Sequence, residues 1–229
     1  MAVSQPAPAP CAGLVLAAGE GRRLGQPKAL LEIGGVRLVE RAVGTLRAAG
    51  CDPVLVVSGA TPLEVHAATV VPNPRWRTGL GSSLRAGLAA LPAQAPAVVI
   101  TLVDTPTVGA EVVHRLVAAW RGGAQVAVAT YAGARRTPVL LARAHWAEAG
   151  ARAEGDTGAR AFLAAHPEWV TEVECADVGR WRDLDTPAEL SSWRAEPRDH
   201  QLTDSHGNGA ELLDHEGAVT AGEDPGAGE

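Results

Sequence analysis

The sequence predicts a single α/β domain built on a doubly wound, mostly parallel sheet. Three runs, at residues 14–18, 53–59 and 97–103, are apolar at nearly every position. Such runs are typical of strands that are buried on both faces, as in a parallel sheet with helices above and below it. Stretches with helical spacing separate the runs, which is the alternation expected for this class. At 229 residues the chain has room for one large domain of this kind.

Shorter elements are expected between these three strands. The helix over residues 38–49 is the clearest of them, because its apolar positions recur at intervals of three and four and Gly50 follows it as a C-terminal cap. In chain order we expect a short strand at 29–33, the helix at 38–49, a short helix opened by Thr61-Pro62, a strand at 69–71, a helix ending near 91, a helix at 108–120, a strand at 124–131, a helix at 158–165, a strand at 170–173 and a last helix with Pro187 in its first turn.

Both ends of the chain are predicted to lie outside the domain. Residues 1–11 form a Pro- and Ala-rich leader without the basic start or apolar run of a signal peptide. Residues 196–229 contain nine acidic residues and one Arg, a net charge of −8, whereas residues 1–195 contain 19 basic and 17 acidic residues. An acidic segment with few large apolar residues is typical of disorder. We therefore expect a domain over residues 12–195 between a flexible leader and a disordered tail.

A glycine-rich loop follows the first apolar run. Gly19, Gly21 and Gly25 allow a positive φ and let a ligand approach main-chain N–H groups. Neither of two common phosphate loops fits the spacing. A P-loop requires Lys and then Ser or Thr after its last glycine, but Gln26 and Pro27 follow Gly25. A dinucleotide fingerprint requires its third glycine one residue earlier.

Lys28 ends this loop, and it is the only lysine in the chain. The other nineteen basic residues are arginines. A compact, strongly hydrated ammonium contacts phosphate oxygens as a point charge, which a planar guanidinium does not do. Together with Arg22 and Arg23, Lys28 places up to three positive charges beside the loop amides. The loop is therefore predicted to bind an anion with several charges, such as a triphosphate.

Further along the chain, polar residues lie at the ends of predicted strands and helices. Such residues can cap a helix, or they can bind a ligand. Asp104 ends the third apolar run, where open α/β sheets place their ligands. It could cap the next helix or bind Mg²⁺, and the triphosphate loop favours Mg²⁺. Ser82 or Ser83 is predicted at a helix N-cap, where amides can bind an anion. Asp156 could be an N-cap, and Asp185 could start the last helix.

These segments resemble the MobA-like nucleotidyltransferases. Residues 16–28 match the signature L-A-[AG]-G-x-[GS]-x-R-[ML]-G-x-x-K at every fixed position. Four further motifs follow in the expected order: N-P-x-W-x-x-G-x-x-x-S-L at 73–84, L-x-D-x-P at 102–106, G-D-x-G-A-R at 155–160 and D-[IL]-D-T-P at 183–187. Ala18 and Pro27 are similar to the branch that contains molybdenum cofactor cytidylyltransferase. One segment departs from the family, because Arg136-Thr137-Pro138 stands where Gly-His-Pro is usual.

The resemblance implies a role for each matching residue and a Rossmann-like nucleotidyltransferase fold. Arg23, Lys28 and Asp104 would be catalytic. Mg²⁺ would bind Asp104 and a second carboxylate, for which we favour Asp183 over Asp185. The acceptor side would include Asp156, Arg160 and Asp185. The nucleotide would contact Leu16, Ala17, Ala18, Gly19, Gly21, Arg23, Lys28, Asn73, Gly79 and Ser83.

The implied reaction transfers CMP from CTP to the phosphate of molybdopterin-molybdenum cofactor, and a molybdenum hydroxylase would receive the product. Three alternatives stay open: a guanylyltransferase of the family, another small-molecule nucleotidyltransferase, and a cofactor-carrying chaperone. An NAD-linked reductase is least supported, because the dinucleotide fingerprint is absent. No apolar window is long enough for a membrane span. The three cysteines lack paired spacing, which predicts a reducing, cytoplasmic setting. The sequence lacks a basic patch beyond the anion loop, so nucleic-acid binding is not predicted.

Overall fold

The computed structural model describes residues 10–195. Its main sheet contains β1 (Ala12–Leu16), β4 (Val54–Ser58), β5 (Thr69–Pro72), β6 (Ala97–Leu102), β7 (Val126–Tyr131), β8 (Ala134–Ala142) and β9 (Val170–Glu174). The strand order is β5-β4-β1-β6-β8-β7-β9, and only β8 runs antiparallel to its neighbours. A two-stranded hairpin of β2 (Glu32–Ile33) and β3 (Val36–Arg37) lies apart from this sheet.

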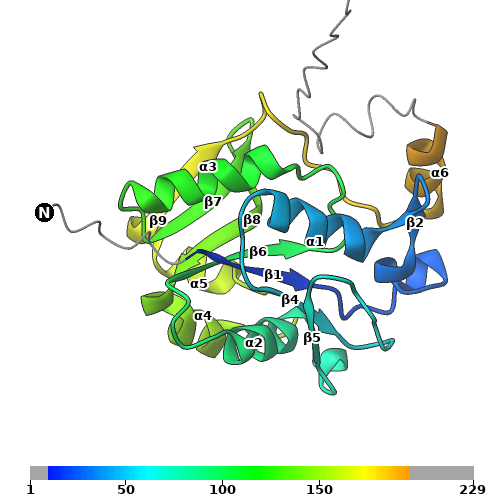
Figure 1. Cartoon of the computed structure of the whole chain (residues 1–229), viewed down its shortest axis with the longest axis horizontal. Helices are drawn as coiled ribbons and strands as arrows, with labels where there is room; N and C mark the ends of the chain where they lie inside the picture. Colours follow the sequence, from blue (N-terminus) through cyan, green and yellow to red (C-terminus); the bar gives the residue numbers. More distant parts are fainter. Residues whose placement is uncertain (1–9, 196–229) are drawn as a thin grey trace, which may run out of the picture.

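Helices cover both faces of the sheet (Figure 1). They are α1 (Leu38–Ala48), α2 (Leu80–Ala90), α3 (Ala110–Arg121), α4 (Trp146–Arg152), α5 (Arg160–Ala165) and α6 (Pro187–Ala195). Helices α1 and α3 pack on one face, whereas α2, α4 and α5 pack on the other. The doubly wound α/β class is therefore confirmed, with a mixed, mostly parallel sheet.

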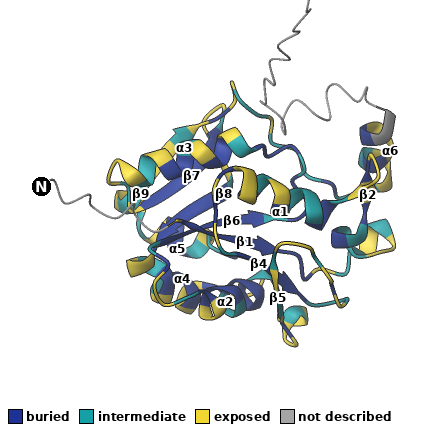
Figure 2. Ribbon diagram, viewed as in Figure 1, coloured by how far each residue is buried: buried dark blue, intermediate teal, exposed yellow. Residues whose placement is uncertain are grey.

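Each face of the sheet has its own apolar core (Figure 2). Side chains along β1 point alternately to the two faces, so this strand contributes to both cores. Val15 belongs to the core under α1 and α3, whereas Leu14 and Leu16 belong to the core on the opposite face. All five residues of β1 and of β4 are buried. The continuously apolar runs of the sequence are thus the central parallel strands, as predicted.

Strand β8 was not assigned from the sequence, and it explains why the sheet is mixed. A tight turn joins it to β7, with positive φ at Ala132 (51°) and Gly133 (77°), as two-residue hairpin turns require. The returning strand inserts between β6 and β7. Its first half is polar and exposed and its second half is buried, so its sequence does not carry one continuous strand pattern.

Some local predictions are wrong, and each error has a physical reason. No helix follows Thr61-Pro62; the segment is irregular, and it buries Leu63 in the core instead. The strand at 29–33 is reduced to Glu32–Ile33, because a short 3₁₀ helix occupies Lys28–Leu30. Helix α1 matches its prediction, and Gly50 adopts the expected positive φ of 78°.

Among residues 10–195, no helix is long and apolar enough to cross a membrane. The three cysteines are free and buried. The predictions for the tail, and for most of the leader, fall outside the described residues.

Two helical glycines provide a test of the packing between α2 and the sheet. At Gly87 a Cβ atom would lie 2.6 Å from Cδ1 of Leu14 and 2.7 Å from its Cδ2, whereas at Gly44 in α1 it would meet nothing within 4 Å. We expect Gly44→Ala to raise the free energy of unfolding by about 0.5–1 kcal/mol. Gly87→Ala should lower it, since overpacking costs roughly 1–3 kcal/mol. Urea denaturation measures both, and an equal gain in the two variants would contradict the close approach.

Candidate active site

A large cavity of about 810 Å³ opens at the carboxyl ends of β1 and β6. The loop after β1, the loop after β6, the start of α2 and the segment before α6 all reach it. Parallel α/β sheets place their ligands at this edge. We call it the main cavity.

The glycine loop forms one wall of the main cavity. Gly21 and Gly25 adopt positive φ values of 64° and 72°, as predicted, whereas Gly19 does not. At Gly21 a Cβ atom would lie 2.0 Å from the carbonyl oxygen of Gln26, so only glycine fits. Within the described residues, no hydrogen bond engages the amide N–H groups of residues 18–21. These amides are therefore available to a ligand in the main cavity.

Lys28 joins two carboxylates across the main cavity. Its Nζ donates to Oδ2 of Asp104 at 2.7 Å and also to Oδ1 of Asp185. Arg23 lies 3.7 Å from the other oxygen of Asp185, but its side chain is 77% exposed, compared with 19% for Lys28. The chain's single ammonium thus lies at the inner end of the site, and Arg23 lies at its rim.

Burial and neighbouring charges shift the pKa of Lys28 in opposite directions. Burial alone would lower the pKa of the ammonium, but the charges and hydrogen bonds of Asp104 and Asp185 outweigh it, so the pKa lies above the usual 10.5. Lys28 is therefore charged at neutral pH.

One oxygen of Asp104 lacks a partner. Its Oδ1 atom is buried and makes no hydrogen bond to any described residue, which is costly unless a ligand supplies a contact. In the described part of the chain, no group of three or more acidic, His or Cys side chains is arranged so that it could hold a metal ion by itself. Two carboxylates with one unsatisfied oxygen suit a hard cation that completes its coordination with phosphate and water. The residues present therefore fit Mg²⁺.

The carboxylate opposite Asp104 is Asp185, whereas Asp183 does not line the main cavity. The prediction from the family resemblance favoured Asp183 over Asp185. Residues 179–185 are irregular, and the amide of Leu184 donates to the carbonyl oxygen of Asp104 at 3.0 Å. The geometry therefore favours Asp185 as the second cation ligand, and the assignment of Asp183 is not supported by its position.

A capping box positions Asp185. The carboxylate of Glu189 accepts hydrogen bonds from the amides of Asp185 and Thr186, both at 2.8 Å. The amide of Glu189 donates to Oγ1 of Thr186 at 3.3 Å, which completes the reciprocal pattern at the start of α6. Pro187 occupies the first helical position, as predicted.

The polar segment at residues 73–83 is held together by hydrogen bonds among its own residues. The Asn73 side chain is buried, and its Nδ2 donates to Oγ of Ser82 at 2.9 Å and Oγ of Ser83 at 3.1 Å. Its Oδ1 accepts from the amide of Arg75 at 3.0 Å. Asn73 does not line the main cavity, unlike Ser83. It is a positioning residue for this loop.

The predicted N-caps lie elsewhere. Gly79, not Ser82 or Ser83, precedes the first residue of α2, with φ of 104°. A Cβ atom there would lie 2.4 Å from the backbone of Gly155, so the two loops pack closely. Asp156 lies at the same helix start rather than at that of α5, because its Oδ1 accepts from the amide of Leu80 at 3.3 Å.

Most of the predicted site residues meet in the main cavity. They are Leu16, Ala18, Gly19, Gly21, Arg23, Lys28, Gly79, Ser83, Asp104, Asp156, Arg160 and Asp185. Ala17, Asn73 and Asp183 do not line it. Arg22, expected beside the loop amides, lines the main cavity as well, whereas the prediction missed Glu20, Trp76 and Arg77. The guanidinium of Arg77 stacks 4.5 Å above the ring of Trp76. The Trp-Arg pair inside a glycine-containing polar segment was the signal available for these two.

A second cavity adjoins the main one and has about 230 Å³. Leu16, Leu80, Leu102 and Arg160 line both. We call it the side cavity. It lies on the α2 and α5 side of the sheet, beside the first half of β8.

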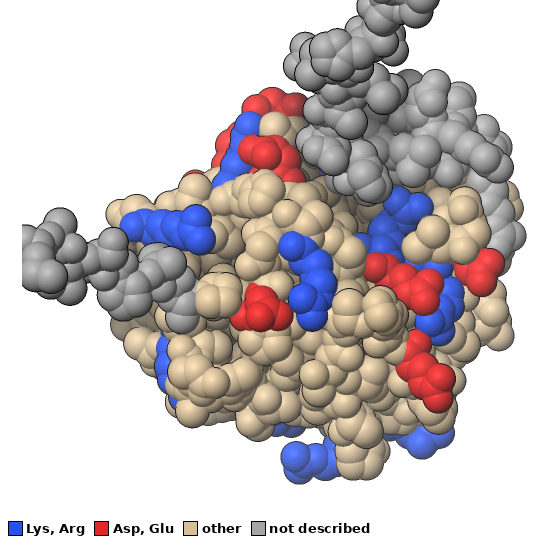
Figure 3. Space-filling model, in the orientation of Figure 1, with Lys and Arg blue, Asp and Glu red and all other residues tan. Residues whose placement is uncertain are grey.

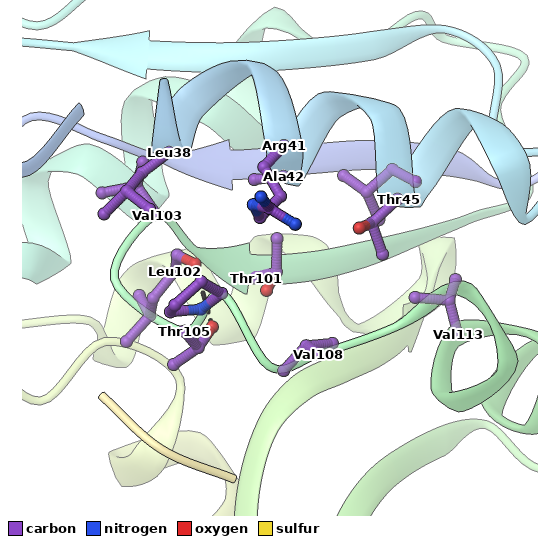
Figure 4. A pocket seen from close by; sticks show the side chains of 12 residues that line it. Leu38, Arg41, Ala42, Thr45, Thr101, Leu102, Val103, Thr105, Val108 and Val113 are labelled. Atoms are coloured by element: carbon purple, nitrogen blue, oxygen red, sulfur yellow. Dashed lines mark hydrogen bonds between the residues drawn. The ribbon is translucent and has the colours of Figure 1, made fainter. Parts of the chain in front are cut away.

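A third, much smaller cavity lies behind the end of β6 (Figure 4). Leu38, Arg41 and Thr45 of α1 face Thr101 and Val103 across it. Its volume is about 10 Å³, which is enough for one water molecule at most. It is a packing defect and not a substrate site.

Charged side chains are mixed on the face of the molecule drawn in Figure 3, where Lys and Arg alternate with Asp and Glu. This face has no broad basic surface of the kind that binds nucleic acid.

Comparisons with known proteins connect this geometry to one family. Residues 13–170 match the MobA-like NTP transferase domain. The chain is 37% identical over 197 residues to nicotine blue oxidoreductase of Paenarthrobacter nicotinovorans, a match that covers 79% of this chain and 95% of that protein. It is 36% identical over 118 residues to molybdenum cofactor guanylyltransferase of Rhodobacter capsulatus, covering 50% of this chain and 61% of that one.

A solved structure shares the fold. The manganese complex of Rv0371c from Mycobacterium tuberculosis superimposes on this chain with a TM-score of 0.69, and the two sequences are 23% identical. The match covers 82% of this chain and 100% of that one. At this identity the likeness concerns the fold alone.

The role of Asn73 is testable by stability. Asn73→Ala removes the donor to two buried hydroxyls, so we expect the free energy of unfolding to fall by about 1–3 kcal/mol. Gln125→Ala is the matched control, because that exposed amide makes one 3.4 Å hydrogen bond. Its change should stay within about 0.5 kcal/mol. Urea denaturation compares the two, and equal small losses would show that Asn73 does not organise the loop.

The raised pKa of Lys28 predicts a pH dependence in metal-free protein. A raised folded-state pKa contributes stability below the unfolded value of 10.5, and this contribution is lost as pH rises through the folded-state pKa. Wild type should therefore exceed Lys28→Met in melting temperature by a constant margin up to about pH 10, and the margin should shrink above it. Lys28 is the only lysine, so no other ammonium side chain titrates there. A margin unchanged to pH 11.5 would rule out the coupling.

Proposed function

Because the chain belongs to the MobA-like NTP transferase family, we propose that it is a cytidylyltransferase that transfers CMP from CTP to the phosphate of molybdopterin-molybdenum cofactor. A molybdenum hydroxylase would receive the product. The observation that carries the transferase assignment is the contact of Lys28 with Asp104 and Asp185, beside unengaged loop amides at a large cavity.

The loop after β1 would bind the nucleotide. The free amides of residues 18–21 would donate hydrogen bonds to the base and phosphates, and Arg23 would neutralise charge at the rim. Lys28 would exchange its carboxylate partners for triphosphate oxygens. A phosphate oxygen of the acceptor would then attack the α-phosphorus in line, forming a new P–O bond as the bond to pyrophosphate breaks. No covalent enzyme intermediate is required.

Asp104 and Asp185 would hold Mg²⁺, which supplies charge stabilisation at the α-phosphoryl group and at the leaving pyrophosphate. The buried, unsatisfied Oδ1 of Asp104 supports this assignment. Asp185 replaces Asp183 as the proposed second ligand, because only Asp185 reaches Lys28 and the main cavity.

The choice of CTP rests on two residues. Ala18 and Pro27 stand where the family's guanylyltransferases typically carry Gly and Asp. Ala18 lines the main cavity, so its methyl group narrows the site next to the loop amides. The similarity to a guanylyltransferase over half of the chain makes GTP the main competitor.

A second candidate function comes from the match to nicotine blue oxidoreductase, which covers 95% of that protein. The chain would then act as an oxidoreductase on nicotine blue, of the NAD-linked kind that the sequence supports least. Against this, the glycine loop lacks the dinucleotide spacing, and the Lys28, Asp104 and Asp185 cluster would have no role in hydride transfer.

One experiment separates these functions. The protein is incubated with molybdopterin cofactor, Mg²⁺ or Mn²⁺ and each of the four nucleoside triphosphates, and pyrophosphate release is measured. NADH consumption with nicotine blue is followed in parallel. Faster release with GTP would overturn the choice of CTP, and NADH consumption without pyrophosphate release would establish the oxidoreductase.

Three matched variants test the metal ligands. Asp104→Asn and Asp185→Asn should each lower kcat/KM by about a hundredfold or more, because each removes a charge from the cation site. Asp183→Asn is the control and should stay within about twofold. Mn²⁺ binding followed by electron paramagnetic resonance should weaken in the first two variants only. Loss of Mn²⁺ binding in Asp183→Asn alone would restore the assignment made from the sequence.

A further inference from the structure

The side cavity has a composition unlike that of the main cavity. Its floor is apolar, formed by residues such as Leu84, Ile100 and Val139 from α2, β6 and β8. The main cavity exposes Lys28 and carboxylates, whereas no Asp or Glu among the described residues lines the side cavity. A hydrated metal triphosphate suits the first, and a largely apolar molecule suits the second.

Arginines stand at the side cavity without carboxylate partners. Arg136 and Arg160 both line it, and neither forms an ion pair within residues 10–195. Arg135 also lines it but is paired with Glu172 at 2.7 Å. Two uncompensated guanidinium groups next to an apolar floor favour a ligand that carries an anionic group.

An aromatic ring and a cation together form one side of the side cavity. The guanidinium of Arg136 lies 4.6 Å from the centre of the Trp181 ring, and Nε1 of Trp181 donates to Oγ1 of Thr137 at 3.5 Å. These contacts fix an aromatic surface and a cation together. Arg136 and Thr137 are the residues that depart from the family's usual Gly-His-Pro.

The position of the side cavity suits the second substrate of a transfer reaction. Arg160, Leu16 and Leu102 belong to both cavities, so a molecule in one can reach the other. An apolar cavity of about 150 Å³ holds a benzene molecule. At about 230 Å³ the side cavity has room for a larger, fused ring.

We propose that the side cavity binds the acceptor, and that Arg136 and Trp181 select a flat, largely apolar or heteroaromatic ring system that bears an anionic group. The ring lies against the Trp181 wall and the anionic group faces Arg136 and Arg160, toward the main cavity. This inference rests on the proposed function, because it assigns the second substrate of that reaction.

A fluorescent probe tests the side cavity independently of turnover. Anilinonaphthalene sulfonate combines fused aromatic rings with one anionic group, and its emission rises in apolar surroundings. We expect one probe to bind per chain. Arg136→Ala should weaken its binding by about tenfold, the loss of one charge-assisted contact. Ala159 lines the side cavity, so Ala159→Phe should fill it and abolish binding of the probe.

Arg143→Ala is the matched control. Arg143 also stacks on a tryptophan, 5.0 Å from the ring of Trp146, but it does not line the side cavity. Probe affinity in this variant should remain within about twofold. Saturating Mg²⁺ and CTP should leave the probe bound, since the two ligands occupy different cavities. Displacement of the probe by CTP, or equal affinity in all variants, would overturn the inference.

Turnover then separates this inference from the proposed function. With molybdopterin cofactor as acceptor, Arg136→Ala should raise the KM for acceptor about tenfold and leave the KM for CTP within twofold. An unchanged acceptor KM in both Arg136→Ala and Ala159→Phe would overturn the side-cavity assignment while the transferase stands. No pyrophosphate release from wild type, together with the expected probe pattern, would overturn the transferase and leave the ring-binding cavity established.

Discussion

The contact of one ammonium with two carboxylates connects the parts of the site. Lys28 comes from the loop after β1, Asp104 from the end of β6, and Asp185 from the segment before α6. Two partly buried carboxylates that share one site without a cation would repel each other. The lysine therefore keeps the two acidic groups together in the absence of metal. In the proposed reaction, this cluster would exchange the ammonium for a divalent cation when the nucleotide binds.

An element of this fold could be predicted from the sequence when its pattern lies within the element itself. The strands β1 and β4 and the helix α1 were predictable, because apolar runs and helical spacing are local patterns. Strand β8 was not, since its first residues are polar and exposed and only its pairing with β6 and β7 defines it. Its place in the sheet depends on contacts between distant parts of the chain.

The site shows the same division. The glycine loop and Lys28 could be recognised from residue types, because positive φ and a point charge are properties of single residues. The resemblance favoured Asp183 over Asp185, but which of the two carboxylates reaches the main cavity depends on the irregular path of residues 179–185, which no local pattern predicts. Asn73 resembles a ligand contact in sequence, but its amide faces two serines that lie nine and ten residues away.

The reversed direction of β8 has a consequence for how this protein can diversify. Val139 of β8 pairs with Ile100 of β6, and residues 135–137 continue from there toward the side cavity. Arg135 and Arg136 are exposed, so replacing them disturbs neither core. Under the proposed assignment of the side cavity, mutation of these residues would alter the choice of acceptor without touching the loop proposed to bind the nucleotide. The antiparallel strand β8 would thus let the specificity for the acceptor change while the nucleotide site stays the same.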